Sequence, residues 1–151
     1  MKLYYNDEVA KKIEEKAKQS FSEMPVGKYE IRLDEIEELQ DKRGFGMKFI
    51  VIEGDFKNRK IFKNVYLKSK ENDREKEDTM LGMFAGFLDS CGVTQTQRHE
   101  LFSKEDIQSQ DIKNLFQGKS FKIQLTNRTY NGNTYGEIKK ILEVRDDSQE
   151  F

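Results

Sequence analysis

The segment from Arg59 to Lys68 alternates more regularly than any other part of the chain. Its odd positions are mainly aliphatic, with Ile61, Val65 and Leu67, whereas its even positions alternate basic or polar groups with aromatic rings. Successive side chains of a strand point to opposite faces, so this pattern predicts a strand with one face on a core and one in water. The even positions are Lys60, Phe62, Asn64, Tyr66 and Lys68. The chain is therefore expected to fold around a sheet with one solvent-facing side.

Four more strands are expected. They lie over residues 27–40, 45–53, 119–130 and 133–144. In the first of them the apolar phase shifts after Leu33, which indicates a bulge or a strong bend. Asn131-Gly132, between the last two, is the strongest short-range hairpin signal in the chain, because it suits a turn with positive φ at both positions.

Helices are expected elsewhere. Residues 79–90 form an amphipathic helix that follows an acidic connector over 71–78, residues 99–117 form short helical turns, and residues 7–21 form an N-terminal helix. Three strands, a helix and a hairpin, in that order, match a mainly β fold with helices, a five-stranded antiparallel OB-fold barrel with the helix between strands three and four. The alternative is an open α+β sandwich. The expected divisions are a helical extension (1–24), the OB-fold domain (25–145) and an acidic tail (146–151).

Charge is distributed in blocks along a chain whose formal net charge is −1. Residues 42–70 carry a net charge of +7 and residues 112–145 carry +5, whereas residues 71–111 between them carry −6. Charges act strongly only within about 10 Å in salt, so a near-neutral protein with basic blocks can still bind a polyanion. A chance partition of a charge-rich chain is the alternative explanation.

Signatures of catalysis are weak. Gly44-Phe45-Gly46 lacks the third glycine and the following helix of a phosphate loop. His99 lies in a polar segment and is expected to be a surface residue, and Cys91 is expected to be a small buried side chain. The acidic side chains Glu75, Glu77 and Asp78 fit the solvated start of a helix better than a metal cluster. We therefore expect a protein that is not an enzyme and that has no cofactor and no metal.

Single-stranded nucleic acid is held by cations for its backbone and by aromatic rings on which its bases stack. The predicted strand 59–68 carries both on one face, and in an OB-fold this face and the neighbouring loops bind nucleic acid. The alternative for Phe62 and Tyr66 is that they cover a second small core under the N-terminal helix. The candidate nucleic-acid-binding residues are Lys42, Arg43, Phe45, Lys48, Lys57, Arg59, Lys60, Phe62, Tyr66, Lys68, Lys122, Arg128, Tyr130, Tyr135 and Lys139.

Four short motifs resemble a family of phage and prophage proteins catalogued as a domain of unknown function. The motifs are Pro25-Val26-Gly27-Lys28-Tyr29-Glu30, Gly46-Met47-Lys48-Phe49, Asn58-Arg59-Lys60-Ile61-Phe62 and Tyr130-Asn131-Gly132-Asn133-Thr134-Tyr135. That family is associated with phage replication and recombination modules and with single-stranded DNA binding. The resemblance covers about residues 25–144 and implies a role in phage DNA replication or recombination.

The C-terminus is similar to the acidic tails by which bacterial and phage single-stranded DNA-binding proteins dock replication and repair partners. Asp146, Asp147, Glu150 and the terminal Phe151 carry this similarity, although the proline usual before that phenylalanine is missing. A frayed, solvated end is the alternative.

The sequence thus predicts a non-catalytic single-stranded DNA-binding protein of low sequence specificity. Rival readings are an OB-like protein-interaction module that recruits a recombinase or helicase, and a small nuclease that uses acidic residues of 71–111. No apolar run approaches a membrane span, no signal-peptide core is present and the chain holds one cysteine. A cytoplasmic setting is expected, in the host cell if the protein is phage-encoded. The sequence does not decide between a monomer and a homo-oligomer.

Overall fold

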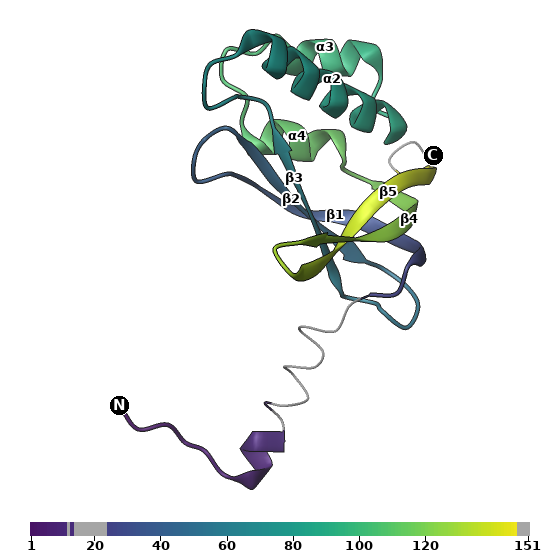
Figure 1. Ribbon diagram of the computed structural model, residues 1–151. Coiled ribbons are helices and arrows are strands. Elements are labelled where there is room, and N and C mark those ends of the chain that lie inside the picture. The colour runs from purple at the N-terminus through teal and green to yellow at the C-terminus, as the bar shows by residue number, and fades with distance from the viewer. Residues whose placement is uncertain (12, 14–23, 148–151) are drawn as a thin grey trace.

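A computed structural model describes residues 1–11, 13 and 24–147 (Figure 1). Residues 7–11 are helical, and the Asn6 side chain caps them by accepting the N–H of Val9 at 2.9 Å. The remainder of the helix expected over 7–21 lies outside the described residues, apart from residue 13. The elements are β1 (Gly27–Glu38), β2 (Gly44–Val51), β3 (Lys60–Tyr66), α2 (Arg74–Ser90), α3 (Gln95–Phe102), α4 (Ser109–Leu115), β4 (Lys119–Tyr130) and β5 (Asn133–Asp146).

The strands form one antiparallel sheet in the order β3-β2-β1-β4-β5. The register of β1 with β2 shifts between Leu33 and Glu35, which confirms the bulge that the apolar phase predicted. Asn131 and Gly132 have φ angles of 51° and 79°, as the predicted hairpin turn requires. In these ladders β1 joins two halves of the sheet, because its residues up to Ile31 pair with β4 and its residues from Ile31 onward pair with β2.

The sheet is not closed into a barrel, so that part of the sequence-based prediction was wrong. Cα atoms of the edge strands β3 and β5 come within 8 Å, but no hydrogen-bonded ladder joins these strands in the described part of the chain. Lys63 of β3 points to the core side, where its Nζ lies 4.7 Å from the centre of the Phe87 ring. A closed seam would bury this ammonium group away from water at high cost, and the open seam leaves Lys63 half-buried.

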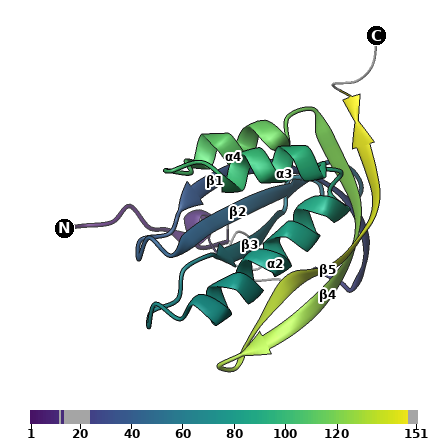
Figure 2. The same cartoon turned by 90° about the horizontal axis from the view of Figure 1, so that it is seen from above.

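The helices cover one face of the sheet, and the core lies between them and the strands (Figure 2). Phe49 of β2 is at the centre of the core, with its ring centre 6.4 Å from those of both Phe87 of α2 and Phe116, the residue after α4. Phe116 in turn contacts Phe121 of β4 at 5.8 Å. One face of the sheet is therefore buried, and the outer face of β2 and β3 is left to solvent. No described helix is long and apolar enough to cross a membrane.

The helical region differs from the prediction at its boundaries. Helix α2 begins at Arg74, five residues before the expected start at residue 79, because the side chain of Asp73 accepts the Lys76 N–H at 3.2 Å and caps it. Glu75 and Glu77 occupy its first turn, where the helix dipole favours negative charge. The short helical turns expected over 99–117 are the two short helices α3 and α4, and α3 begins four residues earlier than expected, at Gln95.

Two glycines should respond oppositely to alanine. A Cβ on Gly44 would overlap the carbonyl oxygen of Val65 and lie 2.8 Å from the Cα of Tyr66, so Gly44→Ala should lower the free energy of unfolding by about 1–3 kcal/mol. A Cβ on Gly82 in α2 would meet open space, so Gly82→Ala should raise the free energy of unfolding by about 0.5–1 kcal/mol. Urea unfolding of both variants measures the difference, and an undisturbed Gly44→Ala protein would contradict the close approach of β2 and β3.

Candidate nucleic-acid interface

The outer face of β2 and β3 carries two exposed rings on a flat backbone. The pairs Lys48–Phe62, Gly46–Asn64 and Gly44–Tyr66 follow one another across the two strands. Phe62 is 64% exposed and Tyr66 is 38% exposed, so in the described part of the chain neither ring is buried in a second core. Gly46 leaves no side chain of β2 between the rings, and Leu39 Cδ2 lies 3.5 Å from where a Cβ on Gly46 would be. We call this face, with its six residues Gly44, Gly46, Lys48, Phe62, Asn64 and Tyr66, the platform.

The cations on this face are partly neutralised by β1. Lys48 Nζ lies 5.7 Å from the centre of the Phe62 ring and 3.2 Å from Oε2 of Glu35. Lys60 Nζ lies 3.8 Å from Oδ2 of Asp34. The sequence-based reasoning missed both carboxylates, although the phase shift in β1 marks the place where the bulge brings them to the outer face. A bound polyanion would compete with them for these lysines.

Arg43 is held beside Tyr66 by local hydrogen bonds. Its guanidinium carbon lies 5.0 Å from the centre of the Tyr66 ring, and its Nε donates to Oδ2 of Asp41 at 2.8 Å. The backbone N–H of Arg43 donates to the other carboxylate oxygen at 3.1 Å, and this bond, followed by the side-chain bond and the charge of Arg43, holds the pKa of Asp41 below its usual range. The carbonyl of Arg43 accepts the N–H of Leu67 at 2.8 Å, which ties the β1–β2 loop to the end of β3.

Phe45 does not belong to the interface, and its inclusion among the candidates is corrected. Odd-numbered residues of β2 face the core, and Phe45 is only 6% exposed. The remaining candidates of this region lie in loops beside the platform. Lys42 is exposed in the β1–β2 loop, Lys57 is exposed and Arg59 half-buried in the β2–β3 loop, and Lys68 is exposed just after β3.

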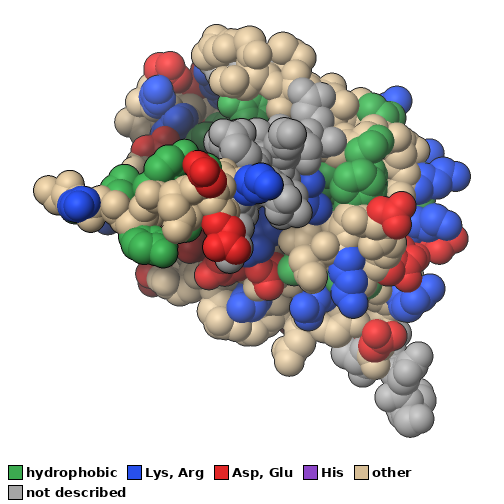
Figure 3. Space-filling view, turned by 90° about the horizontal axis from the view of Figure 1, so that it is seen from below, with side chains coloured by type: hydrophobic (Ala, Val, Ile, Leu, Met, Phe, Trp, Pro, Cys, Tyr) green, Lys and Arg blue, Asp and Glu red, His purple; other side chains and the backbone are tan. Residues whose placement is uncertain are grey.

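A second group of candidates lies on the β4–β5 ribbon, with β1 between it and the platform. Lys and Arg side chains gather on this side of the molecule, with acidic side chains among them (Figure 3). Arg128 lies opposite Tyr135, which is exposed, and 3.7 Å from Glu137. Lys122 lies opposite Glu143, and Lys139 is exposed on β5. The side chain of Tyr130 lies outside what the structure describes.

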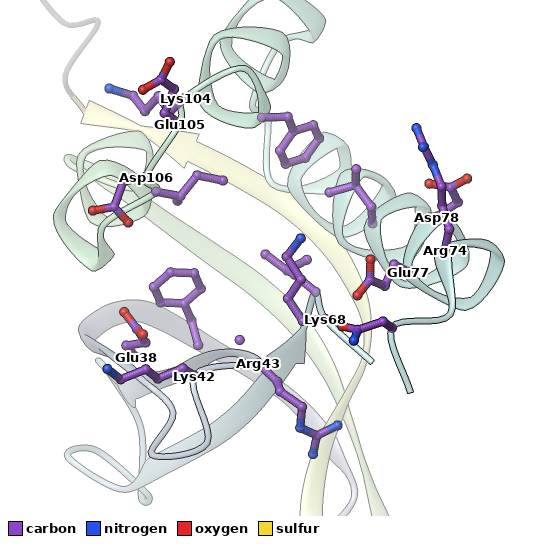
Figure 4. A pocket seen from close by; sticks show the side chains of 17 residues that line it. Glu38, Lys42, Arg43, Lys68, Arg74, Glu77, Asp78, Lys104, Glu105 and Asp106 are labelled. Atoms are coloured by element: carbon purple, nitrogen blue, oxygen red, sulfur yellow. The ribbon is translucent and has the colours of Figure 1, made fainter. Parts of the chain in front are cut away.

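A hollow of about 700 Å³ lies between the β1–β2 loop, the start of α2 and the loop after α3 (Figure 4). We call it the loop hollow. Its rim has five basic and five acidic side chains, so it offers no net charge to a polyanion. Its apolar lining consists of Phe45, Leu67, Leu81, Phe102 and Ile107.

The tail and the residues screened for catalysis lie apart from the platform. Asp146 ends β5 and Asp147 follows it, whereas Glu150 and Phe151 lie outside the described residues. His99 is exposed in α3. Cys91 is buried after α2, and burial raises the pKa of its thiol to about 12. Within the described residues, no group of three or more His, Cys, Asp or Glu side chains is placed to hold a metal ion.

The thiol of Cys91 should be inert in the folded protein. At pH 8 a thiol with a pKa of about 12 is protonated. The nucleophile is the thiolate, and the protonated thiol reacts poorly. A chromogenic disulfide reagent should therefore react with the folded protein only as fast as the protein unfolds around Cys91. In guanidinium chloride, where the protein is unfolded, the reaction should be rapid. Rapid reaction of the folded protein would show that Cys91 is accessible.

Comparison with protein-family models assigns the chain to a family. The model described as "Protein of unknown function (DUF669)" matches residues 10–149, and the chain belongs to this family. The match spans all the elements from β1 to β5. No curated protein matches the chain.

Proposed function

We propose that the protein is a non-catalytic, OB-like protein that binds single-stranded DNA with little sequence preference. An OB-fold is a partly open Greek-key barrel of five strands. The order β3-β2-β1-β4-β5, with helices between β3 and β4, fits such a barrel that lacks only the pairing of β3 with β5. In OB-folds the face of strands two and three binds oligonucleotides, and this face carries the platform.

The observation that carries the proposal is the exposed ring of Phe62 with the ammonium of Lys48 beside it. Base stacking on an aromatic ring contributes about 1–3 kcal/mol and tolerates every base, because every base has a π-face. Tyr66 with Arg43 repeats the arrangement of ring and cation four residues along β3. Two rings about 13 Å apart on one strand suit an extended strand of nucleic acid better than a stacked duplex.

The cellular role that we propose is in phage DNA replication or recombination, and it rests on the sequence motifs that resemble phage and prophage proteins. A strand-coating protein in such a process acts without chemistry. Its acidic C-terminal residues would then recruit replication or recombination proteins.

A second candidate function is an OB-like interaction module for a recombinase or helicase. The loop hollow favours it, because an apolar lining with a rim of balanced charge suits a peptide better than a phosphate backbone. The two candidates differ in the ligand of the platform, which oligonucleotide binding decides directly.

Phe62→Ala and Tyr66→Ala should each weaken binding to oligo-dT by about 1–3 kcal/mol, because each removes a stacking ring. Because Phe62 is exposed, its variant should melt at nearly the wild-type temperature, whereas loss of a core ring costs about 3–5 kcal/mol. Fluorescence anisotropy and thermal melting on the same variants measure both. The matched control is Met83→Ala, which removes an equally exposed apolar side chain from α2 and should leave affinity unchanged. Normal binding by both ring variants would overturn the proposal.

Binding should depend on salt through release of counterions. Each phosphate neutralised on a single strand contributes about −0.7 to the slope of log affinity against log salt, so four to six engaged cations give about −3 to −4. Anisotropy titrations across a salt series measure the slope, with duplex of the same length as the comparison. A flat response, or tighter binding of the duplex, would contradict single-strand recognition by rings and cations.

A further inference from the structure

A second hollow, of about 610 Å³, opens where β4 separates from β1. The pairing of these strands ends at Ile31 and Phe121, and beyond it α4 lies against β1. Leu33, Ile52 and Phe116 form its apolar floor. Arg32, Lys113 and Arg145 contribute basic side chains from three different elements, and Asp147 is the acidic side chain among the described residues that line it. We call it the basic hollow.

The cations of the basic hollow differ from Lys48 of the platform and from the neighbouring Arg43 and Lys60. Arg43, Lys48 and Lys60 each lie within 4 Å of a carboxylate oxygen. Arg32, Lys113 and Arg145 are exposed, and none of them forms a salt bridge within the part of the chain that the structure describes. Lys119 also lines the hollow, but its Nζ lies 3.4 Å from the carbonyl oxygen of Cys91 and is directed to that atom. The basic hollow therefore holds three uncompensated cations against one carboxylate.

A row of residues across the sheet leads from the edge of the platform toward the basic hollow. Arg32 is in register with Ile50, and Ile50 is in register with Lys60, so all three lie on the outer face. Neighbouring strands are about 4.8 Å apart, which places Arg32 about 10 Å from Lys60. Lys60 is two residues from Phe62 on the same face of β3. A strand whose bases stack on the platform thus reaches Arg32 within a few nucleotides.

We propose that the basic hollow binds the phosphodiester backbone of the strand whose bases lie on the platform. Charge complementarity supports this occupant. Arg32, Lys113 and Arg145 form no salt bridge in the described structure, so a phosphate can bind them without displacing a carboxylate. The amides of Gln110, Asn114 and Gln117 on the same wall offer further donors to phosphate oxygens. The inference rests on the proposed function and assigns the two parts of the ligand to two places, with bases on the platform and backbone in the basic hollow.

The test compares a long and a short strand on full-length protein. A slope of 0.7 per phosphate corresponds to about 5-fold in affinity per contact at 0.1 M salt, so Lys113→Gln/Arg145→Gln should lose about 25-fold for oligo-dT of about 20 nucleotides. The salt slope should become less steep by about 1.4. For oligo-dT of about 3 nucleotides, which spans the two rings of the platform and is too short to reach Lys113 or Arg145, affinity should stay unchanged. Arg74→Gln/Lys76→Gln on α2, which lines no part of the basic hollow, is the matched control and should bind both strands normally.

Phe62→Ala separates this inference from the proposed function. If Phe62→Ala weakens binding of both strands while Lys113→Gln/Arg145→Gln weakens neither, the platform binds DNA and the inference about the basic hollow is wrong. If the double variant weakens both strands equally, the assignment of backbone and bases to separate places is wrong. If the wild-type protein binds neither strand, the proposed function fails, and the inference that rests on it fails too. Thermal melting of each variant checks that it is folded.

Discussion

The fold depends on a line of ring contacts that ties the helices to one face of the sheet. Phe87, Phe49, Phe116 and Phe121 come from α2, β2, the end of α4 and β4, and each contacts the next with ring centres about 6 Å apart. Rings are large apolar side chains and prefer such edge-to-face contacts. Because these contacts bring α2 and α4 onto the same face, no helix from Arg74 to Leu115 covers the opposite face of β2 and β3 (Figure 2). The exposure of the platform is thus a consequence of how the core is built.

The outer face combines exposed apolar rings with charges that already have partners. An exposed ring is common on a protein surface, but Phe62 and Tyr66 each lie beside a cation, and this pairing is the basis of the proposed stacking of bases. The carboxylates of Asp34 and Glu35 keep this face from being strongly basic. Affinity for a polyanion would then have to come from cations elsewhere, and the basic hollow supplies them at the end of the same face. The proposal for the strand and the inference about its backbone are physically linked in this way.

Much of the sheet could be predicted because its signals are local. Alternation over 59–68, the phase shift after Leu33 and the Asn131-Gly132 turn each depend on neighbouring residues, and all three are confirmed in position. The failed closure of the barrel could not be predicted in this way, because the pairing of β3 with β5 depends on contacts between residues far apart in the sequence. Phe45 was misassigned because the sequence of β2 is apolar on both faces, so it does not show which of its residues point to the core. The basic hollow went unnoticed because Arg32, Lys113 and Arg145 are scattered over more than a hundred positions.

The way in which β1 joins the sheet has a mechanical consequence. Its ladders to β2 and β4 overlap at Ile31, the bulge follows within a few residues, and no ladder joins β3 to β5 across the seam in the described structure. In the backbone ladders β1 therefore joins the two halves of the sheet, and in the core the rings of Phe49 and Phe121 join them through Phe116. A change in the angle between them needs no backbone hydrogen bond of either ladder to break. A ligand that contacts both halves would fix that angle, and the complex would then be stiffer than the chain alone.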